Sequence, residues 1–290
     1  MVSASIFLED RVTVVGIVNA TPDSFSDGGE LFRGSPPELD VDRAVALGCE
    51  RVRQGAHVLD VGGESTRPGA EAVSADVQIQ RVIPVVEGLA KRVAVPISVD
   101  TRSAEVAAAA LAAGARVVND VSGLVTDEWL AEEVARNHAV LILGHMRGEP
   151  ATMRSFAQYD DLFEEISCEL EIGMARAIDA GVTRDRLVVD PGIGFSKSAE
   201  DSYRLLGSGD WFRKRLGLPV LVGPSRKSFL GGVTGDSVEQ RDEATWAACA
   251  IAAFGGASGV RVHEPAGAAR AVAIGHAARG ISSLATAGVA

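Results

Sequence analysis

Eight short apolar runs, each followed by a segment with helical periodicity, constrain the fold of this chain more than any other feature. The runs cover residues 12–18, 57–61, 96–99, 116–119, 139–143, 187–189, 219–222 and 259–262. They are rich in valine, isoleucine and leucine, which is typical of parallel strands that are covered on both faces. Eight such strand–helix units without a linker predict an α/β fold, a single (β/α)8 TIM barrel that spans residues 1–290.

The segments between these runs carry apolar residues at helical spacing. We expect helices over residues 41–54, 75–93, 104–113, 127–137, 160–180, 200–216 and 242–254, and a last helix from residue 264. Ser103 is the expected N-cap of the third helix, and Gly114 is its expected stop. Long polar loops follow the first two strands, over residues 19–40 and 62–69, and residues 1–11 form a short N-terminal extension.

An open doubly wound sheet with a second domain is the alternative architecture. It requires a glycine-rich turn directly after the first strand and a visible linker between the domains. The sequence has neither feature, so the barrel is the better interpretation.

The charge and cysteine content narrow the class of function. The chain has 28 Lys and Arg against 39 Asp and Glu, a net charge of -11 at pH 7, which argues against nonspecific nucleic-acid binding. Cys49, Cys168 and Cys249 are far apart and fall in expected helices, so we expect reduced thiols rather than disulfides or zinc ligands. No apolar run approaches ~18 residues and residues 1–10 do not resemble a signal peptide, so we expect no membrane segment and a cytoplasmic location.

Polar side chains recur at or just past the carboxyl ends of the expected strands. They are Asn19, Asp60, Asp100, Asn119, His145, Asp190, Lys227, Arg261 and His263. In a (β/α)8 barrel these ends converge on the face where active sites are built, so we expect one constellation. Asp100, Asn119 and Asp190 offer acceptors and donors that suit a flat, nitrogen-rich heterocycle, and Lys227 can donate to a ring carbonyl or nitrogen.

Several other polar residues have simpler interpretations. Asp120, like Ser103, is interpreted as a cap or turn former. His145 and His263 fit hydrogen-bonded structural imidazoles better than ligands, and without a third His or Cys at metal spacing no zinc site is predicted. Nucleophilic catalysis by serine or cysteine is not predicted either, because motifs such as GxSxG are missing.

Cations lie beside these strand ends and indicate an anionic substrate. Arg67 follows the second strand, residues 223–228 (GPSRKS) follow the seventh, and Arg261 with His263 ends the eighth. Barrels commonly bind phosphate near strands seven and eight. The pattern therefore favours a phosphorylated or pyrophosphorylated substrate with oxygen-ligated Mg2+, which needs only one or two protein oxygens, and Asn19 is the expected single ligand.

Seven motifs spread over the chain resemble those of the dihydropteroate synthase family, in the family's order. They are NATPDSFSDGG (19–29), DVGGESTRPGA (60–70), SVDT (98–101), VND (118–120), DPGIGF (190–195), SRKSFLG (225–231) and RVH (261–263). The resemblance implies a transferase of folate biosynthesis that condenses 6-hydroxymethyl-7,8-dihydropterin pyrophosphate with p-aminobenzoate to give 7,8-dihydropteroate and pyrophosphate. It also implies Mg2+ as the cofactor, a homodimer formed through the later helices, and a pocket that sulfonamides bind.

The resemblance further implies roles for individual residues, which fall into three groups. The pterin group is Asp100, Asn119, Asp190, Lys227 and Arg261. The pyrophosphate group is Asn19 through Mg2+, Arg67, Arg261 and His263. The p-aminobenzoate group is Thr66, Arg67, Pro68, Phe195 and Ser228. The expected catalytic residues are Asp100, Lys227 and Arg261.

This chemistry needs no covalent nucleophile, because the pterin methylene carbon can lose pyrophosphate to form a resonance-stabilised cation. Cations and Mg2+ would stabilise the leaving group, and Asp100 would stabilise the positive charge on the pterin. We expect the loops after strands one and two to close over the substrates and exclude water, which would otherwise hydrolyse the cation.

Five residues depart from the usual pattern of the family, namely Gly144, Arg147, Ser196, Asp201 and Ser202. They bear on loop contacts and substrate affinity rather than on the reaction class. Two alternatives stay open. One is a pterin-binding methyltransferase barrel, which has no use for the SRKS and RVH motifs as a pyrophosphate site. The other is a catalytically silent pterin-binding paralogue or partner subunit.

Overall fold

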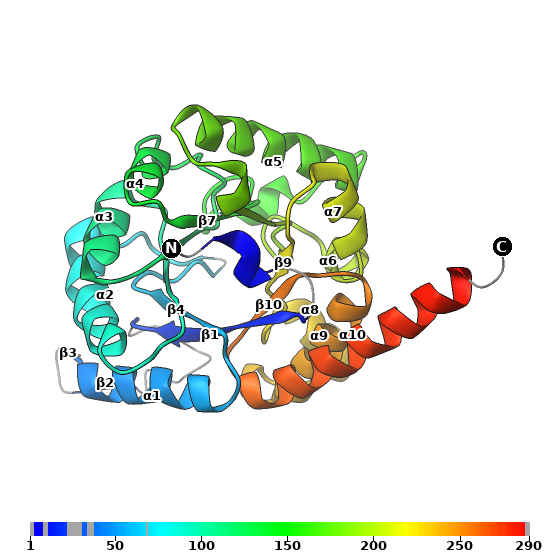
Figure 1. Cartoon of the computed structure of the whole chain (residues 1–290), viewed down its shortest axis with the longest axis horizontal. Coiled ribbons are helices and arrows are strands. Elements are labelled where there is room, and N and C mark those ends of the chain that lie inside the picture. The colour runs from blue at the N-terminus through cyan, green and yellow to red at the C-terminus, as the bar shows by residue number, and fades with distance from the viewer. Residues whose placement is uncertain (1–2, 8–10, 22–30, 34–37, 68, 288–290) are drawn as a thin grey trace.

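The computed structural model describes residues 3–7, 11–21, 31–33, 38–67 and 69–287. Eight parallel strands form a ring that helices surround (Figure 1), as the sequence predicted. They are β1 (Thr13–Asn19), β4 (Val58–Gly62), β5 (Ile97–Asp100), β6 (Val117–Asp120), β7 (Val140–Gly144), β8 (Leu187–Asp190), β9 (Leu221–Val222) and β10 (Gly259–Val262).

The ring closes through one backbone bridge. The hydrogen-bonded neighbours run in the order β8-β7-β6-β5-β4-β1-β10-β9. The two ends of this order meet where Val189 pairs in parallel with Val220, and the Val189 amide donates to the Pro219 carbonyl at 3.0 Å. The carboxyl ends of all eight strands therefore lie on one face of the barrel, as the prediction of a single constellation requires.

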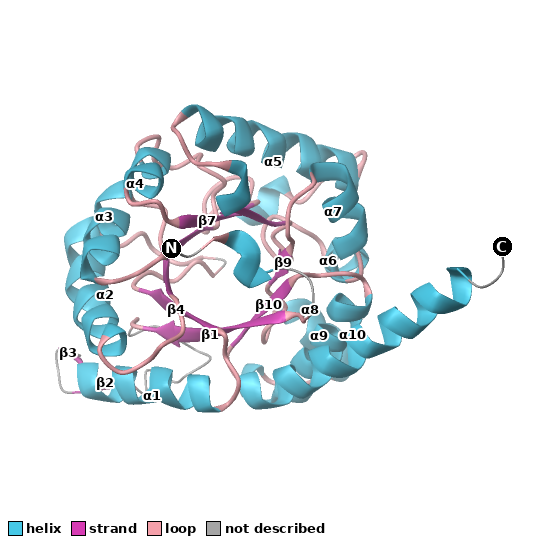
Figure 2. Cartoon of the chain, in the orientation of Figure 1, coloured by secondary structure: helices cyan, strands magenta, loops and turns pink. Residues whose placement is uncertain are grey.

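Helices cover the outside of the ring (Figure 2). They are α1 (Val41–Arg53), α2 (Ala75–Ala90), α3 (Ala104–Ala113), α4 (Leu130–Arg136), α5 (Leu162–Asp179), α6 (Ala199–Leu206), α7 (Gly209–Leu216), α8 (Ser228–Thr234), α9 (Asp242–Phe254) and α10 (Pro265–Ala287). Ser103 caps α3 as expected, since its side chain accepts from the Val106 amide at 3.5 Å, and Gly114 ends the helix with φ 122°. The far end of α10 projects away from the barrel (Figure 1).

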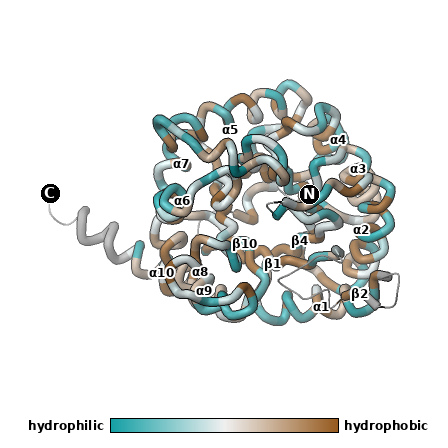
Figure 3. Tube along the Cα trace, turned by 180° about the vertical axis from the view of Figure 1, so that it is seen from behind, coloured by the Kyte–Doolittle hydropathy of each residue, from teal (hydrophilic) through white to brown (hydrophobic). Residues whose placement is uncertain are grey.

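The strands are buried because they pack on both faces. Every residue of β4, β5, β6 and β7 is buried, which explains why these segments lack polar alternation. Viewed from the opposite end, hydrophobic residues run along the strands while hydrophilic residues gather on the outer helices (Figure 3). The hydrophobic effect on both sides of the sheet thus holds the strand ends in place.

The N-terminal turn fills the other end of the barrel. The 3-10 helix η1 (Ala4–Phe7) lies in the middle of the ring in Figure 1. Phe7 is fully buried and packs with Val15, Val58 and Leu221. This apolar plug separates the interior from solvent at the amino ends of the strands, so the polar side chains at the carboxyl ends line a cavity with a closed floor.

The expected helix over residues 200–216 is wrong, because the structure divides it into α6 and α7. The Ser208 hydroxyl donates to the Leu205 carbonyl at 2.7 Å, and the Asp210 amide donates to the Gly255 carbonyl at 2.7 Å. A Cβ at Gly209 would lie 2.3 Å from the Ala257 nitrogen. The chain turns here against the loop that precedes β10, and this tertiary contact overrides a helical pattern that continues through the break.

Three further differences concern short elements. α8 was not predicted, since Gly231 and Gly232 lie in its middle and lower helix propensity. β2 (Phe32–Arg33) pairs with β3 (Glu38–Leu39) inside the segment that was expected to be an irregular polar loop. α4 begins at Leu130 rather than 127, because the Asp127 carboxylate accepts from the Ala104 and Trp129 amides and forms a turn instead.

Cys49, Cys168 and Cys249 are unpaired and lie on α1, α5 and α9. Within the described ranges, none of the helices combines the length and the apolar character needed to cross a bilayer.

Candidate active site

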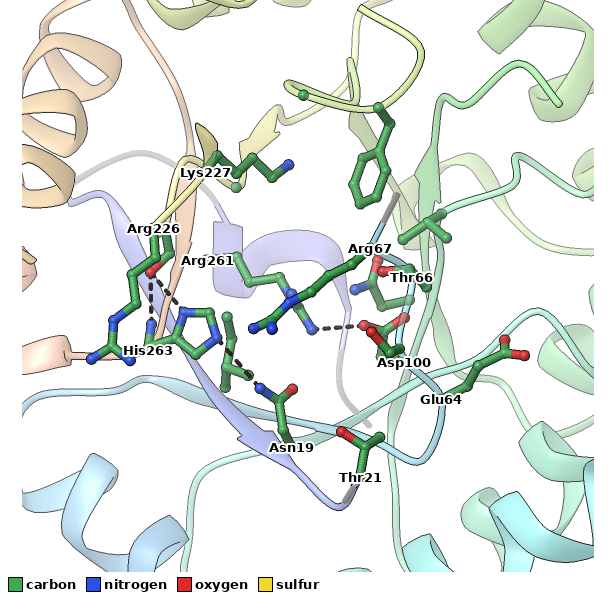
Figure 4. Close-up of a pocket in the computed structure, with 18 of the residues that line it drawn as sticks. Asn19, Thr21, Glu64, Thr66, Arg67, Asp100, Arg226, Lys227, Arg261 and His263 are labelled. Atoms are coloured by element: carbon green, nitrogen blue, oxygen red, sulfur yellow. Dashed lines mark hydrogen bonds and ion pairs between the residues drawn. The ribbon is translucent and has the colours of Figure 1, made fainter. Parts of the chain in front are cut away.

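A cavity of about 370 Å³ opens at the carboxyl ends of the strands (Figure 4). Its wall includes most of the residues that the sequence predicted for the site. They are Asn19, Thr66, Arg67, Asp100, Asn119, Asp190, Phe195, Lys227, Ser228, Arg261 and His263. Pro68 and residues 22–30 of the first loop lie outside the described residues. The strand ends therefore bring together side chains that are up to 244 positions apart, as between Asn19 and His263.

Arg261 of β10 joins two carboxylates at the floor of the cavity. Its Nε donates to Asp60 Oδ2 at 2.6 Å, and its Nη2 donates to Asp100 Oδ2 at 2.7 Å. Asn119 Nδ2 donates to the same Asp60 oxygen at 3.1 Å. Burial raises the pKa of Asp100 to about 7, although the guanidinium of Arg261 favours its ionised form. Asp60 lies one layer deeper than Asp100, because it pairs with Ser98 in the register of β4 and β5.

A second acid–base pair lines the cavity near β8 and β9. Burial raises the pKa of Asp190, and its Oδ1 accepts from the Gly192 amide at 2.8 Å. Burial lowers the pKa of Lys227 to about 8, while Asp190 opposes this shift. Lys227 Nζ donates to the Ile193 carbonyl and lies 4.2 Å from the centre of the Phe195 ring. The ammonium thus stands between a carboxylate, a carbonyl and an aromatic face.

His263 connects Asn19 with the residues after β9. Its Nε2 lies 3.4 Å from Asn19 Nδ2, and its Nδ1 lies 2.9 Å from Ser225 Oγ. Burial lowers the pKa of His263 well below its usual range, and the charges of Arg226, Arg261 and Arg67 act in the same direction. A neutral ring that accepts from Asn19 carries its proton on Nδ1 and donates to Ser225. This arrangement directs the Asn19 carbonyl oxygen away from His263 (Figure 4).

The donor set at Asn19 fits a divalent cation held mainly by a substrate. Mg2+ takes six oxygen ligands and commonly uses one or two from the protein, with phosphate and water completing the shell. The Asn19 carbonyl oxygen, which points away from His263, would provide one such ligand. Among the residues that the structure describes, no group of three or more His, Cys, Asp or Glu side chains offers a cage for an ion.

The structure tests the sequence-based interpretations of His145 and Asp120. His145 lies outside the cavity wall and is hydrogen-bonded on both nitrogens, to Glu169 and Lys197, so its structural interpretation is confirmed. Asp120 forms a turn by accepting from the Ser122 and Leu124 amides. The interpretation of Asp120 as a turn former is therefore also confirmed.

Sequence reasoning placed Asp60 in the constellation and residues 223–228 beside an anionic substrate, but it gave no partners to Asp60, Ser225 or Arg226. Asp60 ends a predicted strand, but its pairing with Arg261 was not anticipated; an arginine inside a buried strand signals that an anionic partner lies nearby. Ser225 holds His263 through both the ring and the backbone amide. Arg226 is bound bidentately by Asp242 at 2.8 and 2.9 Å, so this cation of the SRKS segment is already paired within the chain.

Comparison with known proteins agrees with the motifs. A family model described as pterin binding enzyme matches residues 15–263. Dihydropteroate synthase from Synechocystis is 44% identical over 255 residues, 88% of this chain and 86% of the relative.

Among solved structures, Yersinia pestis dihydropteroate synthase with a sulfonamide drug has a TM-score of 0.86 at 38% identity and covers 93% of this chain and 95% of its own. The Xanthomonas albilineans enzyme in complex with 7,8-dihydropteroate has a TM-score of 0.79 at 39% identity, with 93% and 94% coverage. The chain belongs to the pterin-binding enzymes and, within them, to the dihydropteroate synthase family.

Proposed function

We propose that this chain condenses 6-hydroxymethyl-7,8-dihydropterin pyrophosphate with p-aminobenzoate to 7,8-dihydropteroate and pyrophosphate. One cavity combines a carboxylate- and amide-lined floor with a cationic rim, and this combination supports the reaction above all. The floor suits a heterocycle with several N–H groups, and the rim suits a polyanionic leaving group. The reaction is a transfer of the pterin methylene from oxygen to nitrogen.

The pterin binds at the floor. Asp100, Asn119 and Asp190 present carboxylate and amide groups to the ring, and Lys227 donates to a ring carbonyl or nitrogen. Arg261 fixes Asp100 through their ion pair and so prevents it from rotating away. These side chains are held by neighbours before the ring enters, so little further ordering is needed when it binds.

The pyrophosphate binds at the rim beside β1 and β10. Arg67 and Arg261 supply cations to the phosphate oxygens. His263 is neutral and bonded on both nitrogens, so it acts on this part of the site by orienting Asn19. Asn19 would hold Mg2+ through its carbonyl oxygen. Bound there, Mg2+ would neutralise charge on the departing pyrophosphate. Arg67 and Arg261 contribute to the same stabilisation as positive charges held by the protein.

p-Aminobenzoate binds between the second loop and the start of α8. Thr66, Arg67, Phe195 and Ser228 line this part of the cavity, and Pro68 joins them by sequence. The Phe195 ring provides an apolar face for the aromatic ring of the amine. This subsite places the amine against the methylene carbon of the pterin, so that attack becomes effectively unimolecular.

The chemical step breaks the bond between the methylene carbon and the pyrophosphate oxygen. The electron pair leaves with pyrophosphate, and the pterin becomes a resonance-stabilised cation next to the Asp100 carboxylate. The amine nitrogen then donates its lone pair to the methylene carbon and releases one proton to solvent. No side chain of the site needs to form a covalent bond.

The protein is proposed to act as a homodimer in the cytoplasm. Ile251 and Phe254 on α9 and Ile274 on α10 are 52%, 50% and 69% exposed, which supports a partner surface on these adjoining helices. Free cysteines suit a reducing compartment. Sedimentation equilibrium of the purified chain tests the dimer, since an Ile251→Glu change would then shift the mass toward that of one chain.

Product identification tests the reaction. The purified chain is incubated with dihydropterin pyrophosphate, Mg2+ and ring-labelled p-aminobenzoate. The products are separated by chromatography and identified by mass spectrometry. Labelled 7,8-dihydropteroate is the expected product. Binding of the pterin without any labelled product would identify a silent paralogue instead.

A further inference from the structure

A hydrogen-bonded network outside the cavity wall reaches the backbone carbonyl of Phe195. Lys197 Nζ donates to the Phe195 carbonyl at 2.9 Å and contacts His145 Nδ1 at the same distance. His145 Nε2 lies 2.9 Å from Glu169 Oε2 on α5. The chain Glu169, His145, Lys197 therefore ends on the backbone of a residue that lines the cavity.

The protonation states of this network follow from its contacts. Burial lowers the pKa of His145 to about 4, and the neighbouring Lys197 acts in the same direction, so the imidazole is neutral. Partial burial opposes ionisation of Glu169, but the bonds from His145 and Arg147 lower its pKa to about 2. A carboxylate accepts from His145 Nε2–H, which leaves the Nδ1 lone pair to accept from Lys197. Lys197 is thus the donor in both of its bonds.

Ser196, the next residue in the chain, also binds the Phe195 carbonyl. Its φ is +45°, in the left-handed region where a residue other than glycine is uncommon. Three hydrogen bonds stabilise this conformation. The Ser196 hydroxyl donates to the Phe195 carbonyl at 2.8 Å and accepts from the Arg147 amide at 2.9 Å, and the Ser196 carbonyl accepts from the Tyr159 hydroxyl at 3.0 Å.

The Phe195 carbonyl is consequently bound twice, by Lys197 and by Ser196. Its amide donates to the Gly192 carbonyl at 3.0 Å, so both ends of the residue are fixed. Residue 192 must be glycine, because its φ is +71° and a Cβ there would lie 1.9 Å from the His145 carbonyl oxygen. On the cavity side, the Phe195 ring faces the ammonium of Lys227.

The same network accommodates the departures from the usual family pattern at Arg147 and Ser196. The Arg147 guanidinium binds Glu165 and Glu169 and lies 4.1 Å from the centre of the Tyr159 ring. The Arg147 amide binds Ser196, as described above. Two residues that are separated by 49 positions are therefore joined, and both are connected to the Phe195 carbonyl.

We propose that Lys197 and Ser196 are positioning residues for the amine substrate: they fix the Phe195 carbonyl, and thereby hold the Phe195 ring where it forms the aromatic wall of the p-aminobenzoate subsite. Glu169 and His145 orient Lys197 for this task. The inference rests on the proposed function, because it assigns the Phe195 side of the cavity to the amine. Neither side chain lines the cavity, so both act through Phe195.

The test compares Lys197→Met and Ser196→Ala with two matched controls. Lys214→Met removes an exposed ammonium from α7, and Ser208→Ala removes a buried hydroxyl that donates to the Leu205 carbonyl between α6 and α7. For each protein, KM for p-aminobenzoate and for dihydropterin pyrophosphate are measured separately, and pterin binding is measured by calorimetry.

Each of the two variants is expected to raise KM for p-aminobenzoate by about three- to tenfold, the effect of one lost hydrogen bond on the Phe195 carbonyl. In Ser196→Ala, pterin affinity and KM for dihydropterin pyrophosphate stay within about twofold of the parent, because Asp100, Asn119 and Asp190 are untouched. In Lys197→Met the lost charge also acts on Asp190, so Ser196→Ala is the decisive variant for this comparison. Both controls behave like the parent. If Lys197→Met does not fold, Ser196→Ala alone gives the answer.

Unchanged KM for p-aminobenzoate in an active Ser196→Ala protein would overturn the positioning role while leaving the proposed function intact. Equal increases in both KM values would also overturn it, because they indicate general loosening of the barrel. A parent protein that forms no 7,8-dihydropteroate would instead contradict the proposed function. The two failures are therefore distinguishable.

Discussion

Arg261 Nη2 and Asp100 Oδ2 form a 2.7 Å ion pair at the floor of the cavity, although 161 positions separate the two residues. The pair exists because β10 and β5 end on the same face of the barrel. Arg261 binds Asp60 at the same time, so one guanidinium holds two carboxylates at different depths. The position of Asp100, which the proposed mechanism places beside the pterin cation, therefore depends on Arg261.

Replacing Arg261 by Lys tests this dependence. A lysine ammonium cannot reproduce the two directed bonds of the guanidinium, so one carboxylate loses its partner. We expect kcat/KM for dihydropterin pyrophosphate to fall about 10- to 100-fold, as for one lost hydrogen bond between charged groups. Arg279→Lys is the matched control, since Arg279 binds Asp210 on the outer surface at 2.6 Å. Equal activity of Arg261→Lys and parent would contradict the role of the pair.

The pH dependence of kcat/KM should be bell-shaped. Burial raises the pKa of Asp100 to about 7, and the mechanism needs its carboxylate, so activity falls as the pH drops below that value. Burial lowers the pKa of Lys227 to about 8, and the site needs its ammonium, so activity falls again as the pH rises above that value. Asp100→Asn should remove the acid limb and leave the alkaline one. An acid limb that persists in Asp100→Asn must belong to another group.

Mg2+ dependence distinguishes Asn19 from the other polar residues of the rim. Asn19→Ala removes the side-chain carbonyl oxygen and should raise the Mg2+ concentration for half-maximal activity by about tenfold or more. Replacing even a residue that only holds a metal ligand commonly lowers metal affinity by about tenfold or more. Asn19→Asp keeps an oxygen ligand and should require less Mg2+ than Asn19→Ala. Steady-state rates over a Mg2+ titration give the comparison. Full activity of Asn19→Ala at low Mg2+ would contradict the metal role.

The stability of the protein can be changed at the apolar plug, which lies at the amino ends of the strands and away from the site. Phe7 is fully buried, and Phe7→Ala leaves a cavity among Val15, Val58 and Leu221. We expect the free energy of unfolding to fall by about 3–5 kcal/mol, measured in urea, while Phe7→Leu costs less than about 1.5 kcal/mol. Folded Phe7→Ala should keep its substrate KM values. A large change in KM would show that the plug also shapes the cavity.

The structural features that were predicted correctly from the sequence depend on residues close together in the chain. Buried strands, the Ser103 cap and the Asp120 turn each follow from residues close in the chain, and the barrel follows from repeating them. The break between α6 and α7 could not be predicted, because it is caused by contact with Gly255 on a later loop. The helix α8 was missed because its two glycines lower the helix propensity of the segment. Burial of Phe229 and Leu230 stabilises it in the folded chain.

For the site, the same division holds. The barrel rule placed Asn19, Asp100 and His263 on one face without showing which side chains touch. The partner of Arg261 depends on strand register, which sets Asp60 one layer below Asp100. Likewise, the link from Glu169 to Phe195 joins three segments whose approach only the folded chain reveals.

Pyrophosphate release is the most direct test of the proposed function. The purified chain receives dihydropterin pyrophosphate and Mg2+, with p-aminobenzoate in one sample and without it in the other. Release that requires p-aminobenzoate is the predicted result, because the amine captures the pterin cation. If neither sample releases pyrophosphate while calorimetry still detects pterin binding, the proposed synthase function is contradicted.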